Sequence, residues 1–238
     1  MIGILLAGGE GTRLRPFTNH FNKHFYPVFD KPMVYYSLRQ FELIGLKKVF
    51  VVCKKKDRLK FKEIINFYFN FVEIVFINQE KPLGAMHAIS ICKSKIKCRE
   101  VVINMGDHFL FDFKKNKQVI EAIKKYKNII FCIQSKKISE FGNLKFDKKN
   151  QFEKIIEKPK KKYSNFILTG LMKVSTRIIP DIQNLKKSKR NEYEVANFIN
   201  DNYKYFNCIK LQKNYLWTDM GTFERIRKLS GQIRNNGI

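Results

Sequence analysis

Three glycines and an arginine lie together near the N-terminus, directly after an apolar run. The stretch reads Gly8-Gly9-Glu10-Gly11-Thr12-Arg13-Leu14. Glycines let backbone N–H groups approach a ligand without an intervening Cβ, and successive N–H groups form a concave anion-binding site. Arg13 adds a permanently charged, forked donor that suits phosphate oxygens. The stretch therefore predicts a phosphate-binding loop; the alternative is a tight turn with a surface arginine.

Three further charged side chains extend this prediction. Lys23 follows the loop closely enough to return to it and to supply a second cation for a triphosphate. Asp107 comes directly after an apolar run, where a carboxylate can hold Mg²⁺ together with phosphate oxygens. Its alternative role is to cap the next turn. Asp219 precedes a glycine and a predicted helix, so a cap and a second metal ligand are both open.

The elements that must position these residues alternate between strands and helices. Continuous apolar runs predict buried strands at 2–7, 49–53, 72–78, 101–105 and 129–133, and apolar spacing predicts helices at 33–44, 59–69 and 119–126. This alternation predicts a mostly parallel, Rossmann-like sheet flanked by helices. Ligands of such sheets bind at the carboxyl ends of the strands. Gln79 and the turn at 81–84, which precedes a helix starting near residue 85, are thus candidates for base or ribose contacts.

The second half of the chain has a different pattern. Residues 141–147 and 152–159 predict a hairpin, and 166–174 predicts a strand in which Gly170 marks a close approach. Helices are predicted at 192–203 and 223–233, with a strand at 208–211 between them. The fold class is therefore α/β with a small β-rich insertion. We expect one domain over residues 1–238, with a nucleotide-binding part at 1–135 and a sugar-binding part plus the terminal helix at 136–238.

The composition excludes several classes of protein. The formal net charge is +26, but only ten of the 47 basic residues are arginine and the lysines are spread over the chain. We therefore expect weak, non-specific contact with nucleic acid rather than a nucleic-acid-binding function. Five cysteines without a C-x-x-C pair indicate neither a disulfide framework nor a zinc site. No apolar run is long enough to span a membrane and no signal peptide is evident, which predicts a cytoplasmic protein.

Several motifs, taken in order, carry a family resemblance over essentially the whole chain. They are Leu6-Ala7-Gly8-Gly9-Glu10-Gly11-Thr12-Arg13-Leu14, Lys23 with the segment 27–33, Gly106-Asp107, Phe141-Gly142, Glu157-Lys158-Pro159, Thr169-Gly170-Leu171 and Trp217-Thr218-Asp219-Met220-Gly221-Thr222. With these motifs the chain resembles the sugar-1-phosphate nucleotidylyltransferases, and among them the glucose-1-phosphate thymidylyltransferases. The resemblance implies an enzyme that transfers a nucleotidyl group from dTTP to glucose 1-phosphate and releases pyrophosphate.

The resemblance also implies a role for individual residues. The catalytic residues would be Arg13, Lys23, Asp107 and Lys158, and Asp107 and Asp219 would hold Mg²⁺ as cofactor. The nucleotide would contact Leu6, Gly8, Gly9, Gly11, Thr12, Arg13, Gln79 and Gly84. The sugar would contact Gly142, Glu157, Lys158 and Thr169. The partners would be the two substrates, with no specific nucleic acid and no membrane, and a homodimer stays open.

Three positions depart from the thymidylyltransferase pattern. His108 replaces the usual Asn, His87 replaces a Gln near the base, and Phe141 replaces a Tyr. The identities of the base and the sugar are therefore open, and CTP, UTP or GTP with another phosphorylated acceptor is an alternative. The alternative from a different class is a non-catalytic nucleotide-sugar sensor or a basic nucleic-acid-binding protein. The chain also ends soon after the predicted terminal helix, without the C-terminal extension of longer relatives, so neither inhibition by a distal sugar nucleotide nor the tetramer of those relatives should be assumed.

Overall fold

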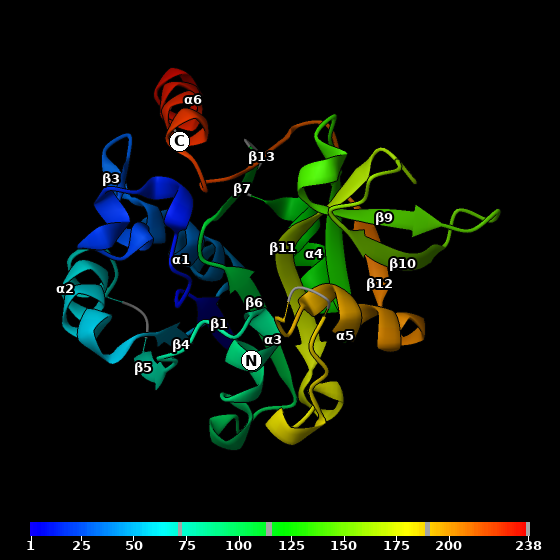
Figure 1. Ribbon diagram of the computed structural model, residues 1–238, viewed down its shortest axis with the longest axis horizontal. Helices are drawn as coiled ribbons and strands as arrows, with labels where there is room; N and C mark the ends of the chain where they lie inside the picture. The colour runs from blue at the N-terminus through cyan, green and yellow to red at the C-terminus, as the bar shows by residue number, and fades with distance from the viewer. Residues whose placement is uncertain (71–72, 113–115, 189–190, 237–238) are drawn as a thin grey trace.

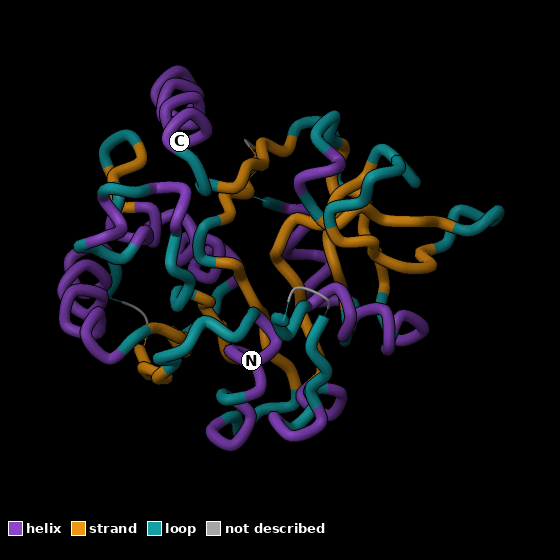
Figure 2. The backbone as a smooth tube through the Cα atoms, in the orientation of Figure 1, coloured by secondary structure: helices purple, strands orange, loops and turns teal. Residues whose placement is uncertain are grey.

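A nine-stranded sheet runs through the middle of the protein (Figures 1 and 2). The computed structural model describes residues 1–70, 73–112, 116–188 and 191–236. The sheet order is β10-β9-β11-β6-β1-β4-β5, with β8 beside β11 and β12 beside β8. Its strands are β1 Ile2–Leu6, β4 Lys48–Cys53, β5 Glu73–Asn78, β6 Glu100–Met105, β8 Ile129–Gln134, β9 Gly142–Phe146, β10 Phe152–Glu157, β11 Phe166–Ser175 and β12 Asn207–Lys210.

Strands β1, β4, β5 and β6 are parallel, as predicted, and helices cover both faces of the sheet. Successive residues of β1 point to opposite faces: Leu5 packs with helices α1 Met33–Ile44, α2 Arg58–Tyr68 and α4 Lys117–Lys125. Ile4 packs on the other side with α3 Ala85–Ser90 and α5 Val195–Asp201. The mixed, mostly parallel sheet between helices confirms the predicted fold class. Its parallel strands bring their carboxyl ends to one edge.

The second half adds antiparallel strands. Strands β9 and β10 form the predicted hairpin, and β11 runs antiparallel to β6, β8 and β9 (Figure 1). Within β11, Gly170 has φ +83°, and a Cβ there would lie 2.2 Å from Nδ1 of His108. The predicted close approach is thus made by a side chain. Helix α6 Phe223–Asn236 closes the chain and packs on a third apolar cluster that includes Leu14 and Met220.

Four strands were missing from the sequence-based prediction. Strand β7 His108–Asp112 and strand β13 Tyr215–Asp219 pair antiparallel in a separate two-stranded sheet. A second small sheet is formed by β2 Pro27–Val28 and β3 Lys31–Pro32. The helix predicted at 192–203 was too long, since α5 begins only at Val195, and residue 72 of the predicted third strand lies outside the described residues. Within the described residues, no helix has the length and apolarity needed to cross a membrane.

Candidate active site

The glycine-rich loop follows β1 and opens on a cavity of about 380 Å³, here called the loop cavity. Gly11 adopts φ +64°, and a Cβ there would lie 3.0 Å from side-chain atoms of Lys23 and Thr18, so the loop requires glycine at this position. Most of the residues predicted to contact a nucleotide line this cavity: Leu6, Gly8, Gly9, Gly11, Thr12, Gln79 and Gly84. They come from the carboxyl ends of β1 and β5 and from the turn before α3.

Lys23 reaches the same cavity from a short 3₁₀ turn at Lys23–Phe25. Asn22 fixes this turn: its side chain accepts a hydrogen bond from the backbone N–H of His24 and donates to the Ala7 carbonyl and the Asp57 carboxylate. Lys23 Nζ then lies 2.5 Å from Oδ2 of Asp107. The sequence-based prediction brought Lys23 back to the loop but missed Asn22, whose contacts lie 15 and 35 residues away along the chain.

Asp107 and Asp219 are brought together by the pairing of β7 with β13. In the ladder between these strands, Asp219 is opposite His108, the residue after Asp107. The backbone N–H of Met220 also donates to the Asp107 carbonyl at 2.7 Å. Two carboxylates separated by 112 positions in the sequence therefore lie side by side. The two-stranded sheet that the sequence-based prediction missed is what positions them.

The two carboxylates differ in their electrostatic surroundings. Burial by itself raises the pKa of Asp107, but nearby positive charge, above all that of Lys23, outweighs burial and holds the pKa far below its usual range. Burial, together with the nearby Asp107 carboxylate, raises the pKa of Asp219 above its usual value. Asp107 therefore carries its negative charge more firmly than Asp219 does.

Two arginines flank Asp219. Arg13 Nη2 lies 3.5 Å from Oδ2, and Arg225 Nη1 lies 2.5 Å from Oδ1. Arg225 also forms an ion pair with Glu140, so it connects α6 to the segment before β9. The Arg13 side chain is 60% exposed and lines a second cavity rather than the loop cavity. Arg13, predicted to contact the nucleotide, therefore lies beside Asp219 in the second cavity.

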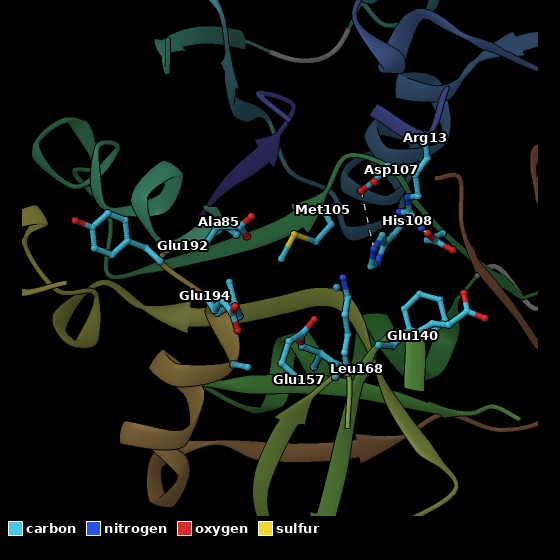
Figure 3. A pocket seen from close by; sticks show the side chains of 18 residues that line it. Arg13, Ala85, Met105, Asp107, His108, Glu140, Glu157, Leu168, Glu192 and Glu194 are labelled. Atoms are coloured by element: carbon cyan, nitrogen blue, oxygen red, sulfur yellow. Dashed lines mark ion pairs between the residues drawn. The ribbon is translucent and has the colours of Figure 1, made fainter. Parts of the chain in front are cut away.

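The second cavity, here called the hairpin cavity, has a volume of about 370 Å³. It is lined at one end by the hairpin residues Phe141, Gly142, Glu157 and Lys158. Gly142 and Glu157 are opposite each other in the β9–β10 ladder, and a Cβ on Gly142 would come within 3.2 Å of the Glu157 carboxylate. In Figure 3, Met105 and Asp107 lie on one side of this cavity, with Glu157 and Leu168 on the other.

The two cavities adjoin. Both are lined by Ala85, Met105, Asp107 and Glu192. Two of these shared residues, Asp107 and Glu192, are acidic, and Asp107 forms the ion pair with Lys23. Groups bound in the two cavities would meet beside this aspartate.

Thr169 is placed differently from its predicted role in sugar contact. Its side chain is fully buried, and its hydroxyl donates to the Phe131 carbonyl at 3.0 Å. Its own carbonyl accepts from Trp217 Nε1 and contacts His108. Thr169 therefore does not line the hairpin cavity and instead joins three strands beneath it, while its neighbours Leu168 and Gly170 face the cavity. The reason is the alternation of side chains along β11, which directs Thr169, between Leu168 and Gly170, to the side away from the cavity.

The sequence-based prediction also missed the segment 192–194. These residues precede α5 and line the hairpin cavity with Glu192, Tyr193 and Glu194. Tyr193 donates to the Leu83 carbonyl and accepts from the Met86 N–H, which attaches the segment to the turn before α3. The sequence-based prediction missed these cavity-lining residues because the apolar spacing of α5 continues over residues 192–194, which were therefore assigned to the helix.

Two carboxylates of the site, Asp107 and Asp219, are candidate ligands for a magnesium ion. Among the described residues, no group of three or more Asp, Glu, His or Cys side chains could hold a metal. Asp107, which lines both cavities, and Asp219, which lines the hairpin cavity, form a pair of hard oxygen donors. Mg²⁺ commonly binds to one or two protein carboxylates and takes its remaining ligands from water and substrate phosphates. The donor set therefore suits Mg²⁺ better than zinc or another soft metal.

His24, next to Lys23, makes folding stability depend on pH. It is fully buried, Nε2 has no hydrogen-bond partner in the described part of the chain, and burial lowers its pKa from 6.5 to about 3. Above pH 6.5 the imidazole is neutral in both the folded and the unfolded state. Between pH 6.5 and about 3 only the unfolded state binds the proton, so the free energy of unfolding should fall by about 1.4 kcal/mol per pH unit as the pH is lowered.

Urea unfolding at pH 7.5, 6.0 and 5.0 measures this slope. His24→Leu should lose the part of the slope that belongs to His24, whereas His20→Leu, which changes an exposed histidine, should keep it. Equal slopes in the wild type and His24→Leu would contradict a neutral buried imidazole.

Comparisons with known proteins found relatives that match over nearly the whole chain. The sequence profile described as "Nucleotidyl transferase" matches residues 2–236. A glucose-1-phosphate thymidylyltransferase of Mycolicibacterium smegmatis is 30% identical over 98% of this chain and 82% of its own length. The corresponding protein of Neisseria meningitidis is 29% identical over 98% of this chain and 83% of its own.

Solved structures resemble the fold closely. A crystal structure of a UDP-glucose pyrophosphorylase in complex with UDP-glucose has a TM-score of 0.86 at 19% identity and covers 98% of both chains. A Bacillus anthracis protein assigned as a glucose-1-phosphate thymidylyltransferase has a TM-score of 0.85 at 24% identity and covers 99% of this chain and 96% of its own.

Proposed function

The chain belongs to the nucleotidyl transferase family, and from this premise we propose that it transfers a nucleotidyl group from dTTP to glucose 1-phosphate. The observation that carries the proposal is the junction at Asp107. The loop cavity and the hairpin cavity meet there, and Lys23 lines the first while Asp219 lines the second. Two polyanionic substrates that must react with each other need such a pair of adjoining cavities with cations at the boundary.

The proposed reaction is a direct displacement. An oxygen of the sugar phosphate forms a bond to the α-phosphorus of the nucleoside triphosphate, and the bond from that phosphorus to the β-phosphate oxygen breaks, so that pyrophosphate leaves. The protein's contribution is to position the reactants and to neutralise charge that develops in the transition state. Backbone N–H groups of the glycine loop, Lys23 and Arg13 would bind the triphosphate. Lys158, at the wall of the hairpin cavity, would bind the sugar phosphate.

Magnesium is proposed as the cofactor, held by Asp107 and Asp219. When bound, it would supply positive charge to the phosphate oxygens. In the structure, Lys23 forms an ion pair with Asp107 and Arg13 forms an ion pair with Asp219. Lys23 and Arg13 therefore neutralise the two carboxylates in the free protein. When the carboxylates bind the metal, the two cations would be available to bind phosphate oxygens.

The proposed sugar contacts are Gly142 and Glu157, which face the hairpin cavity. The relatives named as thymidylyltransferases favour dTTP and glucose 1-phosphate as substrates. UTP is the second candidate donor, because a buried amide at Gln79 can pair with uracil as well as with thymine. We further propose a single domain with its nucleotide-binding part at 1–135 and its sugar-binding part at 136–238; a homodimer and a cytoplasmic location remain predictions.

A pyrophosphate-release assay tests the proposal. The full chain should release pyrophosphate when incubated with glucose 1-phosphate, Mg²⁺ and dTTP or UTP, and EDTA should abolish the release. Mass spectrometry should identify the matching nucleotide sugar. Release with another nucleoside triphosphate or another sugar 1-phosphate would change the substrates but keep the reaction. No release across all four bases and a broad panel of sugar 1-phosphates would refute the enzyme and favour a nucleotide-sugar sensor.

A further inference from the structure

The side-chain amide of Gln79 has a defined orientation in the loop cavity. Gln79 is 5% exposed, and its Nε2 lies 2.9 Å from Nδ1 of His87 and 3.4 Å from the Gly84 carbonyl oxygen. A carbonyl oxygen can only accept a hydrogen bond, so the contact with Gly84 requires the NH₂ group on that side. Oε1 consequently points the other way, toward Gly8, where a Cβ would lie 2.6 Å from it. A ligand in the loop cavity would therefore face a hydrogen-bond acceptor, Oε1 of Gln79.

His87 holds this orientation without lining either cavity. With the Gln79 NH₂ group directed at it, Nδ1 of His87 must act as the acceptor, which places the imidazole proton on Nε2. Burial lowers the pKa of His87, which favours the neutral ring that this hydrogen bond needs. The ring also stacks on Tyr193, with centroids 6.2 Å apart and planes at 19°. The imidazole is thus held from two sides.

We propose that His87 is a specificity-positioning residue: it locks the Gln79 amide so that Oε1 faces the loop cavity and selects a base that offers a ring N–H. This inference rests on the proposed function and names the class of its donor. Uracil and thymine offer such a donor at N3, whereas the N3 of cytosine is an acceptor and would face Oε1 with a lone pair. The chain therefore discriminates against cytosine through a residue that does not touch the base.

The opposite orientation of Gln79 has an identifiable cost. With the amide reversed, Oε1 would face the Gly84 carbonyl oxygen, and two acceptors would oppose each other. The reversed state would also need a proton on Nδ1 of His87. Replacing His87 by leucine removes the acceptor and leaves only the long 3.4 Å contact to hold the amide. Glutamine at position 87 could still accept from Gln79 through its own Oε1.

Calorimetric binding of UMP and CMP to the full chain tests the proposal, because these ligands differ only in the base. Wild type should bind UMP more tightly by about 10- to 100-fold, the usual effect of an unpaired buried acceptor. His87→Leu should reduce this preference at least about tenfold, His87→Gln should restore most of it, and His20→Leu should leave it unchanged. The rescue by glutamine separates a role in orientation from a general loss of packing.

Nitrogen NMR of the four histidines gives a test that needs no variant. Nδ1 of His87 should be unprotonated in the free protein. A protonated Nδ1, an unchanged UMP preference in His87→Leu, or a loss in His87→Gln as large as in His87→Leu would overturn the proposal. A preference for UMP without pyrophosphate release would refute the proposed function but support the proposed role of His87 in orienting Gln79. Turnover that does not distinguish UTP from CTP would refute the proposed role of His87 but not the proposed function.

Discussion

Replacing Asp107 by asparagine should lower kcat for pyrophosphate release by about 100-fold or more. Asp107 lies at the junction of the two cavities, and its ion pair with Lys23 holds its pKa far below the usual range, so the group is charged at any pH at which the enzyme works. Asparagine keeps the shape but removes the negative charge on which the proposed magnesium site depends. The measurement is steady-state kinetics with saturating Mg²⁺ and both substrates.

The matched control for this substitution is Asp201→Asn. Asp201 is exposed at the end of α5 and lines neither the loop cavity nor the hairpin cavity. Its replacement makes the same chemical change and should leave kcat within about twofold, as expected for a surface substitution. Circular dichroism would verify that both variants fold. A kcat for Asp107→Asn close to that of Asp201→Asn would exclude the proposed metal role of Asp107.

Replacing Lys23 by methionine should lower kcat by about 100- to 1,000-fold and also destabilise the fold. The activity falls because the triphosphate loses a cation at the glycine loop. The stability falls because the Asp107 carboxylate, 19% exposed, then lacks the partner that lies 2.5 Å away. Since both side chains retain some contact with solvent, the cost should be about 1–3 kcal/mol, less than for a fully buried pair.

A double-mutant cycle separates these two effects. Adding Asp107→Asn to Lys23→Met removes the unpaired charge, so the double variant should unfold at a higher urea concentration than Lys23→Met alone while staying inactive. Lys60→Met serves as the control, because Lys60 forms an exposed ion pair with Glu63 on α2 and should change neither property substantially. Strictly additive losses of stability would show that Lys23 and Asp107 do not interact in solution.

Local sequence patterns predicted the parts of the protein that depend on neighbouring residues. Apolar runs predicted the strands of the parallel sheet, and the helix at 33–44 has its predicted bounds. Glycines after β1 predicted a loop whose backbone N–H groups a ligand can approach. An aspartate after β6 predicted a carboxylate at the edge of the sheet. These features follow from periodicity and from the topology of parallel strands, which place the ends of β1, β5 and β6 at one edge.

The tertiary structure decided the features that depend on contacts between distant segments. The pairing of β7 with β13 brings Asp219 to Asp107, yet neither strand has an alternation strong enough to be recognised by itself. The pairing of β11 with β8 buries Thr169 and brings its hydroxyl to the Phe131 carbonyl. The contacts of Tyr193 with the turn before α3 bring Glu192 to both cavities.

The residues that adjust the site show the same division. Asn22 and His87 act through contacts with Ala7, Asp57 and Gln79, which no local pattern records. The sequence by itself therefore determined the types of chemical group and the strands that carry them, because backbone periodicity and turn chemistry are local. Only the folded chain decided which groups meet, how each amide and carboxylate is oriented, and which candidate is buried, because these depend on packing between segments far apart in sequence.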